Sequence, residues 1–156
     1  MPHIHEKIDF CSEVLIVFKN KVLLRKHDKY KIWLSVGGHI ELDGDPNETA
    51  VREAKEEVGL DVVLYKEEGK QPDFKDEKHK SLIPPQFIFT HQVNETHSHI
   101  VFIYFAKSET DQLKLSDTEV TEDCRWFTKE EVVKNDVGML PMLQFYALKA
   151  LEALSE

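Results

Sequence analysis

The stretch GGHIELDGDPNETAVREAKEEVGL, residues 37–60, decides the fold, because it holds a glycine pair followed by a helix with its own start and stop signals. Asp45 can accept a hydrogen bond at an N-cap, the proline after it suits the first helical position, and Glu48 completes a capping box. Gly59 suits the left-handed residue that closes a helix. The spacing predicts a helix over residues 46–58.

Three glutamates of this helix, Glu53, Glu56 and Glu57, fall within an arc of about 100° on a helical wheel. Like charges at these spacings destabilise a helix by about 0.2–0.5 kcal/mol per pair, and the helix dipole disfavours anions in the second half. Small residues that can pack against a sheet border this arc: Ala50, Val51, Ala54 and Val58. Oxygen ligands grouped in this way suit a hard cation such as Mg²⁺ or Mn²⁺, and the alternative is a solvated acidic face.

Aliphatic runs on both sides of this stretch predict β-strands. They cover residues 12–18, 21–26, 31–41 with a break at the glycine pair, 61–68, 86–93 and 99–107. Lys19-Asn20 between the first two runs indicates a tight turn. The last run is apolar on both alternating faces, so we expect it at the centre of a sheet that is covered on both sides.

Two further segments complete the organisation of the chain. Residues 66–83 are rich in charge and form either a solvated connection or a loop that covers a substrate. Apolar residues at helical spacing behind Pro141 predict a packing helix. The chain of 156 residues is long enough for one domain with a hydrophobic core, so we expect a single layered α/β domain over residues 1–156.

Composition excludes several classes of protein. A net charge of −9 argues against the basic surface that drives nucleic-acid binding, and an anionic ligand would need a cation to offset the repulsion. The sequence shows neither a signal peptide nor an apolar run as long as a membrane span, so the cytoplasm is the expected location and no membrane partner is expected. Cys11 and Cys124 have no paired spacing and are expected to be reduced, mostly buried thiols.

The residues from Gly38 to Leu60 resemble the signature of the Nudix hydrolase superfamily, which includes MutT. That signature reads Gly, five residues, Glu, seven residues, Arg-Glu, aliphatic, any, Glu-Glu, any, Gly, aliphatic, and CRWFTKEEV at residues 124–132 also fits the family. The resemblance implies an α/β/α sandwich around a central mixed β-sheet. It also implies Mg²⁺-dependent hydrolysis, with Mn²⁺ as a substitute, of a nucleoside diphosphate linked to another group, such as a nucleoside triphosphate.

The resemblance assigns roles to particular residues. The catalytic set is Glu53, Glu56, Glu57 and Arg52; the metal set is the same three glutamates with Gly37; the substrate-binding set is Gly38, Glu41 and Arg25. One carboxylate is expected to act as general base towards the attacking water. The glycines let the backbone approach the ion or the phosphates closely, and Glu41 is expected to join through water.

Two positions depart from the signature. Its first glutamate, a partner of the motif arginine in the family, falls on Gly44, and the usual proline before the glycine pair is Val36. Candidates to take over the role of the missing glutamate are Asp43, Asp45 and Glu48. The substitution at Gly44 keeps a second function open, that of a nucleotide-sensing module that has the fold and little catalytic activity.

Other candidate site residues follow outside the signature. A late carboxylate can complete such a site, and Glu119 and Glu122 are the candidates. His91, His97 and His99 raise a zinc site as an alternative, although a third or fourth converging ligand is not evident from spacing. Aromatic residues that either stack on a base or fill the core are Trp33, Phe87, Phe89, Tyr104 and Trp126. The expected partner is a small nucleotide, and a homodimer is compatible with the sequence.

Overall fold

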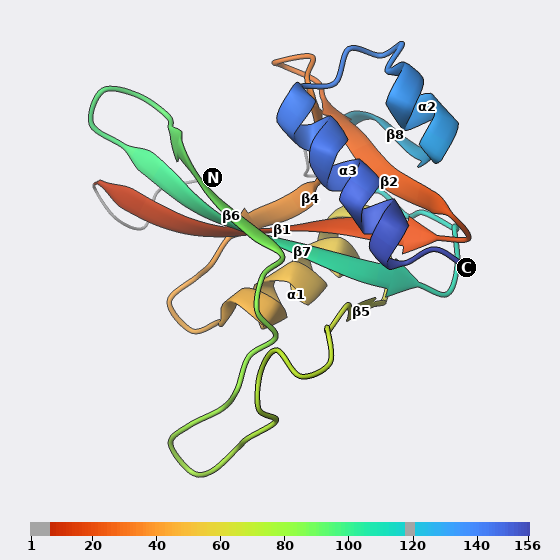
Figure 1. Ribbon diagram of the computed structural model, residues 1–156. Coiled ribbons are helices and arrows are strands. Elements are labelled where there is room, and N and C mark those ends of the chain that lie inside the picture. Colours follow the sequence, from red (N-terminus) through yellow and green to blue (C-terminus); the bar gives the residue numbers. More distant parts are fainter. Residues whose placement is uncertain (1–6, 118–120) are drawn as a thin grey trace.

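The computed structural model describes residues 7–117 and 121–156, except for the side chains of residues 121 and 122. Within these residues it has one mixed sheet of eight strands and helices on both faces (Figure 1). The strands are β1 (Ile8–Phe18), β2 (Lys21–His27), β3 (Trp33–Leu34), β4 (Val36–His39), β5 (Val62–Leu64), β6 (Phe87–Gln92), β7 (Ser98–Ser108) and β8 (Thr121–Thr128). The helices are α1 (Pro46–Val58), α2 (Lys129–Lys134) and α3 (Pro141–Ala153).

The parallel pair β1 and β7 forms the centre of the sheet. Its register runs from Ile8 opposite Ser98 to Val17 opposite Lys107. On its other edge β1 pairs with β4 along its first half and with β2 along its second half. β7 pairs in the same way with β6 and then with β5. The strand that was predicted at the centre is therefore β7. The central pair has different neighbouring strands at its two ends, β4 and β6 at one end and β2 and β5 at the other.

Two hydrophobic clusters form the two sides of the sandwich. Alternation along β1 sends Val14 and Ile16 to the side of α1, and Leu15 and Val17 to the side of α2 and α3. Figure 1 shows α3 lying across one face of the sheet while α1 lies on the opposite face. The predicted α/β/α sandwich around a central mixed sheet is confirmed.

Helix α1 has the predicted limits because its caps form as the sequence indicates. The Asp45 carboxylate accepts from the backbone N–H of Glu48 at 2.8 Å, and Gly59 has the left-handed φ of 75°. The buried side of α1 is wider than predicted, because it contains Glu53 and Glu57 as well as Ala50, Ala54 and Val58. Val51, expected on the packing side, is 38% exposed, so that part of the prediction was wrong.

Other boundaries differ where tertiary contacts decide them. The segment 31–41 forms two short strands, and the strand after α1 covers only Val62–Leu64. Strand β8 was not predicted; it pairs with β2 along the edge of the sheet. Lys19 and Asn20 have φ values of 43° and 63°, which confirms the predicted tight turn.

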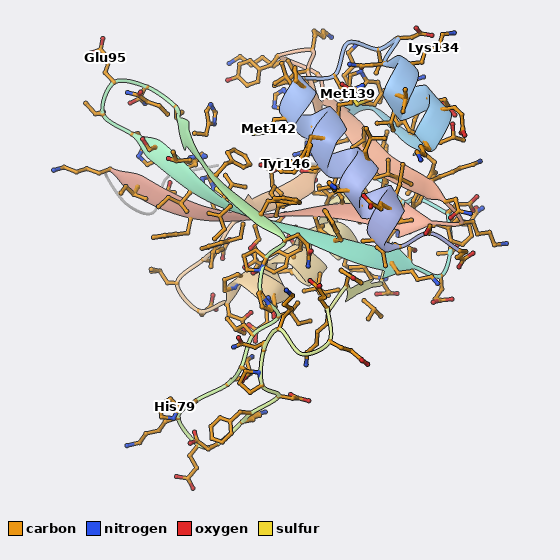
Figure 2. The ribbon with its side chains drawn as sticks, in the orientation of Figure 1. His79, Glu95, Lys134, Met139, Met142 and Tyr146 are labelled. Carbon is orange, nitrogen blue, oxygen red and sulfur yellow. The ribbon has the colours of Figure 1, made fainter. Side chains whose placement is uncertain are left out.

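The segment between β5 and β6 has no helix or strand of its own, and contacts at one place tie it to the start of α1. The Asn47 side chain exchanges two hydrogen bonds with the backbone of Ile83, at 2.8 and 3.0 Å. Lys80 Nζ lies 2.9 Å from Asp45 and 3.2 Å from Glu48. Figure 2 shows His79 at the far tip, directed away from the sheet, which favours a solvated connection.

The two cysteines are free thiols, as expected. Burial raises the pKa of each thiol to about 12, so both are protonated at neutral pH. Among the residues that the structure describes, no helix is long and apolar enough to cross a membrane.

Removing the N-cap carboxylate of α1 should destabilise the protein in a pH-dependent way. Partial burial raises the pKa of Asp45, but hydrogen bonds from the Glu48 N–H and from Lys80 outweigh it, and this pKa lies below its ordinary value of 3.8. A lowered folded-state pKa stabilises the protein above the unfolded-state pKa, and the stabilisation is lost as the pH falls through the folded-state pKa. We expect Asp45→Ala to lower the free energy of unfolding by about 1 kcal/mol at neutral pH.

Urea unfolding of wild type and Asp45→Ala, at neutral pH and again well below the ordinary pKa of aspartate, measures this effect. The difference between the two proteins should shrink at the lower pH. Asp45→Asn is the matched control, because asparagine keeps the cap acceptor and removes only the charge that faces Lys80. An equal loss at both pH values would show that the charge of Asp45 contributes nothing.

Candidate functional site

Two of the predicted glutamates lie between α1 and the sheet. Glu53 is 4% exposed and Glu57 is 3% exposed. Glu57 Oε2 lies 3.0 Å from Nε of Arg25 on β2, and the same Nε donates to the backbone carbonyl of Ser35 at 3.0 Å. Arg25 therefore reaches the predicted site, where it holds Glu57 and links α1 to the segment between β3 and β4.

The third glutamate of the signature points to solvent. The side chain of Glu56 is 58% exposed, and its Oε1 lies 3.8 Å from Nε of Arg52. Arg52 Nη2 also lies 3.6 Å from Oε1 of Glu53. Arg52 thus stands between one buried and one exposed carboxylate and compensates part of the repulsion between them.

The glycine pair supplies space that a side chain would fill. A Cβ at Gly38 would lie 2.6 Å from Oε1 of Glu53, so the backbone of β4 runs directly beside this carboxylate. A Cβ at Gly37 would collide with the backbone carbonyl of Ser12 and lie 2.7 Å from Cγ of Glu13 on β1. The first glycine therefore allows β4 to pair closely with β1, and the second allows Glu53 to occupy its position.

Gly44, which stands where the signature has its first glutamate, lies beside Arg52. A Cβ at Gly44 would lie 3.7 Å from Nη1 of Arg52, in ordinary contact. Asp45 and Glu48, two of the proposed replacements, are instead engaged with the helix cap and with Lys80. Asp43, the third, is exposed on the loop before α1. The contacts of Arg52 are with Glu53 and Glu56, so neither Asp45 nor Glu48 takes over the role of the missing glutamate.

Three further carboxylates were predicted to join the site. β4 ends at His39, so Glu41 stands on an exposed turn after the strand, where its carbonyl accepts from the Gly44 N–H at 3.2 Å. Glu119 lies outside the described residues, as does the side chain of Glu122, so a late carboxylate stays a prediction.

The aromatic candidates divide between core and partly buried positions. Trp33 and Tyr104 are 4% and 2% exposed and belong to the core. Trp126 donates from its indole N–H to the carbonyl of Asp111 at 3.1 Å. Phe87 and Phe89 pack on Tyr146 of α3, which Figure 2 labels, with ring centroids 5.1 and 6.2 Å apart.

One partly buried carboxylate near the site was missed by the sequence analysis. Glu13 of β1 accepts a hydrogen bond from the Ser35 hydroxyl at 2.8 Å. Burial raises the pKa of Glu13, against the opposing effects of that hydrogen bond and of the positive charge of Arg25. In the sequence Glu13 looks like an ordinary outward residue of a strand, because alternation does not reveal that the outward face is covered.

Comparisons with known proteins identify the family and the fold. The profile of the NUDIX domain matches residues 12–148. A crystal structure of a NUDIX-family hydrolase from Clostridium perfringens superposes with a TM-score of 0.82 at 35% sequence identity, over 94% of this chain and 98% of that chain.

More distant structures share the architecture. A MutT NUDIX hydrolase from Burkholderia pseudomallei has a TM-score of 0.61 at 17% identity, over 96% of this chain and 100% of that chain. An Ap4A hydrolase from C. elegans, solved as a binary complex, has a TM-score of 0.66 at 17% identity, over 93% of this chain and 96% of that chain. At these identities the likeness concerns the fold alone. A search of curated proteins finds no match.

Proposed function

We propose, from the premise that this chain belongs to the NUDIX family, that it hydrolyses a pyrophosphate bond in a nucleoside diphosphate linked to another group, with Mg²⁺ as cofactor. Family membership makes the chain a hydrolase that acts on pyrophosphate bonds. The nature of the nucleotide and the role of Mg²⁺ are the proposed parts. A nucleoside triphosphate is the first substrate to test.

The observation that carries this proposal is the placement of acidic side chains on α1. Glu53 and Glu57 are buried against the sheet, and Glu56 lies beside them at the surface. Buried carboxylates are costly unless a cation or hydrogen bonds offset their charge. Gly38 lets the backbone of β4 lie close to Glu53. The carboxylate oxygens of this group are ligands of the type that Mg²⁺ and Mn²⁺ prefer.

In the proposed hydrolysis each charged residue has a specific role. Mg²⁺, when bound by Glu53, Glu56 and Glu57, would neutralise the diphosphate oxygens and lower the pKa of water. One of these glutamates takes the proton of the attacking water, whose oxygen bonds to phosphorus while the bridging P–O bond breaks. Arg52 pairs with Glu53 and Glu56, and Arg25 pairs with Glu57. The proposal also assigns Arg25 to binding a phosphate of the substrate.

A panel of nucleotides tests this function. Purified protein is incubated with Mg²⁺ and each of several candidates: nucleoside triphosphates, dinucleoside polyphosphates, ADP-ribose and reduced pyridine dinucleotides. Products are separated by ion-exchange chromatography, which also identifies the bond that is cleaved. Binding of a nucleotide without release of any phosphate-containing product from the whole panel would favour the sensing module, for which the glycine at position 44 is the motivating feature.

Restoring a carboxylate at position 44 should strengthen Mg²⁺ binding. A Cβ at Gly44 would make ordinary contact with Arg52 and Thr49 and would collide with neither. In Gly44→Glu the new carboxylate pairs with Arg52, which then competes less with the cation for Glu53 and Glu56. An exposed ion pair contributes about 0.2–1 kcal/mol, so the dissociation constant for Mg²⁺ should fall by up to about five-fold.

Calorimetric titration of Mg²⁺ without nucleotide measures this change. Gly44→Gln is the matched control, because glutamine has the same size and no charge. Equal Mg²⁺ affinity in Gly44→Glu and Gly44→Gln would show that the charge at this position does not act on the site.

A further inference from the structure

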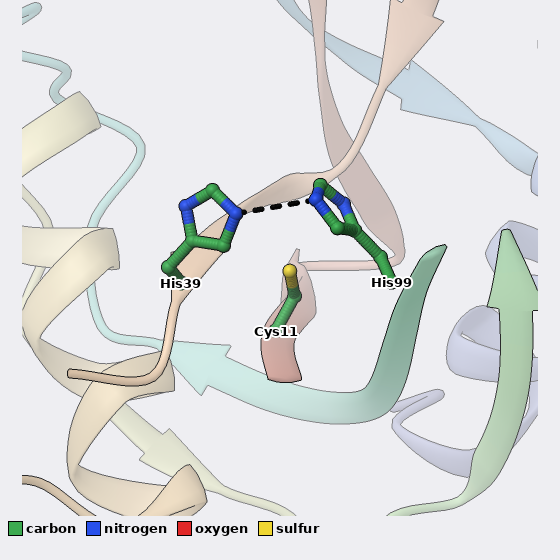
Figure 3. A group of neighbouring side chains, drawn as sticks. All are labelled: Cys11, His39 and His99. Carbon is green, nitrogen blue, oxygen red and sulfur yellow. Dashed lines mark hydrogen bonds between the residues drawn. The ribbon is translucent and has the colours of Figure 1, made fainter. Parts of the chain in front are cut away.

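Five metal-ligating side chains converge on the face of the sheet opposite α1. Asp9 and Cys11 come from β1, and His39 comes from the end of β4. His99 lies at the start of β7, and His97 is the residue just before this strand. The register of the sheet brings them together, because Asp9 stands opposite His99 and Cys11 stands opposite His39. Figure 3 shows Cys11, His39 and His99 with their polar atoms turned towards one another.

Two distances within this cluster are close to the edge length of a tetrahedral metal site. Nε2 of His39 lies 3.3 Å from Nε2 of His99 and 3.5 Å from Oδ2 of Asp9. Metal–ligand bonds of about 2.0–2.1 Å, as zinc makes to nitrogen and oxygen, place neighbouring ligand atoms about 3.3–3.4 Å apart in a tetrahedron. The side chains therefore stand at separations that an ion could bridge with small movements.

Two overlapping groups of three residues share His99. The ligand atoms of Cys11, His39 and His99 all lie within 4.8 Å of one another, and so do those of Asp9, His97 and His99. Nε2 of His97 lies 3.2 Å from Oδ2 of Asp9, so this imidazole is in contact with the carboxylate. The 3.5 Å separation between Asp9 Oδ2 and His39 Nε2 links the two groups, and small side-chain movements would bring Asp9, Cys11, His39 and His99 around one ion.

Four of the five side chains are shielded from water, and His99 is partly exposed. Asp9 is 1% exposed, His97 is 4% exposed, and His39 and Cys11 are each 7% exposed. A buried carboxylate among imidazoles is the kind of polar group that interiors retain when it is paired or coordinates a metal. Imidazole and thiolate ligands select zinc and related transition metals over Mg²⁺, which prefers oxygen. This chemistry separates the cluster from the carboxylates on α1.

We propose that this cluster binds one transition-metal ion of the Zn²⁺ class through Asp9, His39, His99 and Cys11, with His97 orienting Asp9. Binding releases the thiol proton of Cys11 to solvent, and the thiolate becomes the fourth ligand. The ion joins β1, β4 and β7. Because His39 directly follows Gly38, it would also fix the end of the strand that runs beside Glu53.

Titration with Zn²⁺ and with Co²⁺, in millimolar Mg²⁺ so that oxygen sites are saturated, tests the proposal. We expect one equivalent of Zn²⁺ to bind wild type and to raise its melting temperature. His99→Ala should weaken binding about 100-fold or more, since it removes the residue common to both groups. His79→Ala is the matched control, because His79 lies on the distant exposed loop (Figure 2).

The Co²⁺ complex identifies the ligands. A thiolate-to-cobalt absorption band is expected in wild type and should disappear in Cys11→Ser. Circular dichroism in the absence of metal confirms that each variant is folded. If wild type takes up no Zn²⁺ in the presence of Mg²⁺, or if His99→Ala binds it as tightly as His79→Ala does, the cluster is a hydrogen-bonded network and the proposal is wrong. A Co²⁺ complex without the thiolate band would overturn the assignment of Cys11.

Discussion

Glu56→Gln is expected to lower kcat about 10²- to 10⁴-fold, the range associated with loss of a group that moves a proton at the reacting centre. Glutamine keeps the size of the side chain and removes the negative charge that the proposed mechanism uses. Because the Glu56 side chain is 58% exposed, its replacement should leave the packing of α1 unchanged. The loss of activity would then arise from chemistry and not from unfolding.

Steady-state kinetics on the best substrate of the nucleotide panel, together with a thermal melt without metal, checks this expectation. Glu152→Gln on α3 is the matched control, because Glu152 is also an exposed helical glutamate, and its carboxylate pairs with nearby Lys149. It should retain wild-type activity. A Glu56→Gln protein with wild-type kcat would remove Glu56 from the catalytic set.

Gly37→Ala and Gly38→Ala are expected to fail in different ways although the residues are neighbours. The new Cβ at Gly37 meets the backbone of β1, which cannot move without breaking the pairing of β1 with β4. Overpacking of this kind costs about 1–3 kcal/mol and sometimes more, so Gly37→Ala should be strongly destabilised. The new Cβ at Gly38 meets only the end of the Glu53 side chain, which can rotate away.

Gly38→Ala should therefore fold and yet lose most of its activity, since the Glu53 carboxylate is displaced from the site. We expect a decrease in kcat of about 10²-fold, comparable with other misplacements of a catalytic group by about 1 Å. Urea unfolding and kinetics on both variants separate the two effects. Equal losses of stability in the two variants, or a fully active Gly38→Ala, would contradict this account of the glycine pair.

Local hydrogen bonding made α1 predictable. The capping box at Asp45 and the left-handed Gly59 act within a few residues, so the limits 46–58 could be read directly and were confirmed. The turn at Lys19-Asn20 and the central place of β7 followed from equally local signals. Strand β8 could not be found in this way, because its pairing with β2 depends on residues far away in the chain.

By itself, the sequence determined the family, the acidic helix and the position of the glycines, because these depend on residue type and spacing along one segment. Only the tertiary structure decided that Glu53 and Glu57 are buried while Glu56 is exposed, since that depends on which strands cover α1. It also decided that Asp9 meets His39 and His97. These residues lie far apart in the chain, and the register of parallel and antiparallel strands, which no local pattern specifies, brings them together.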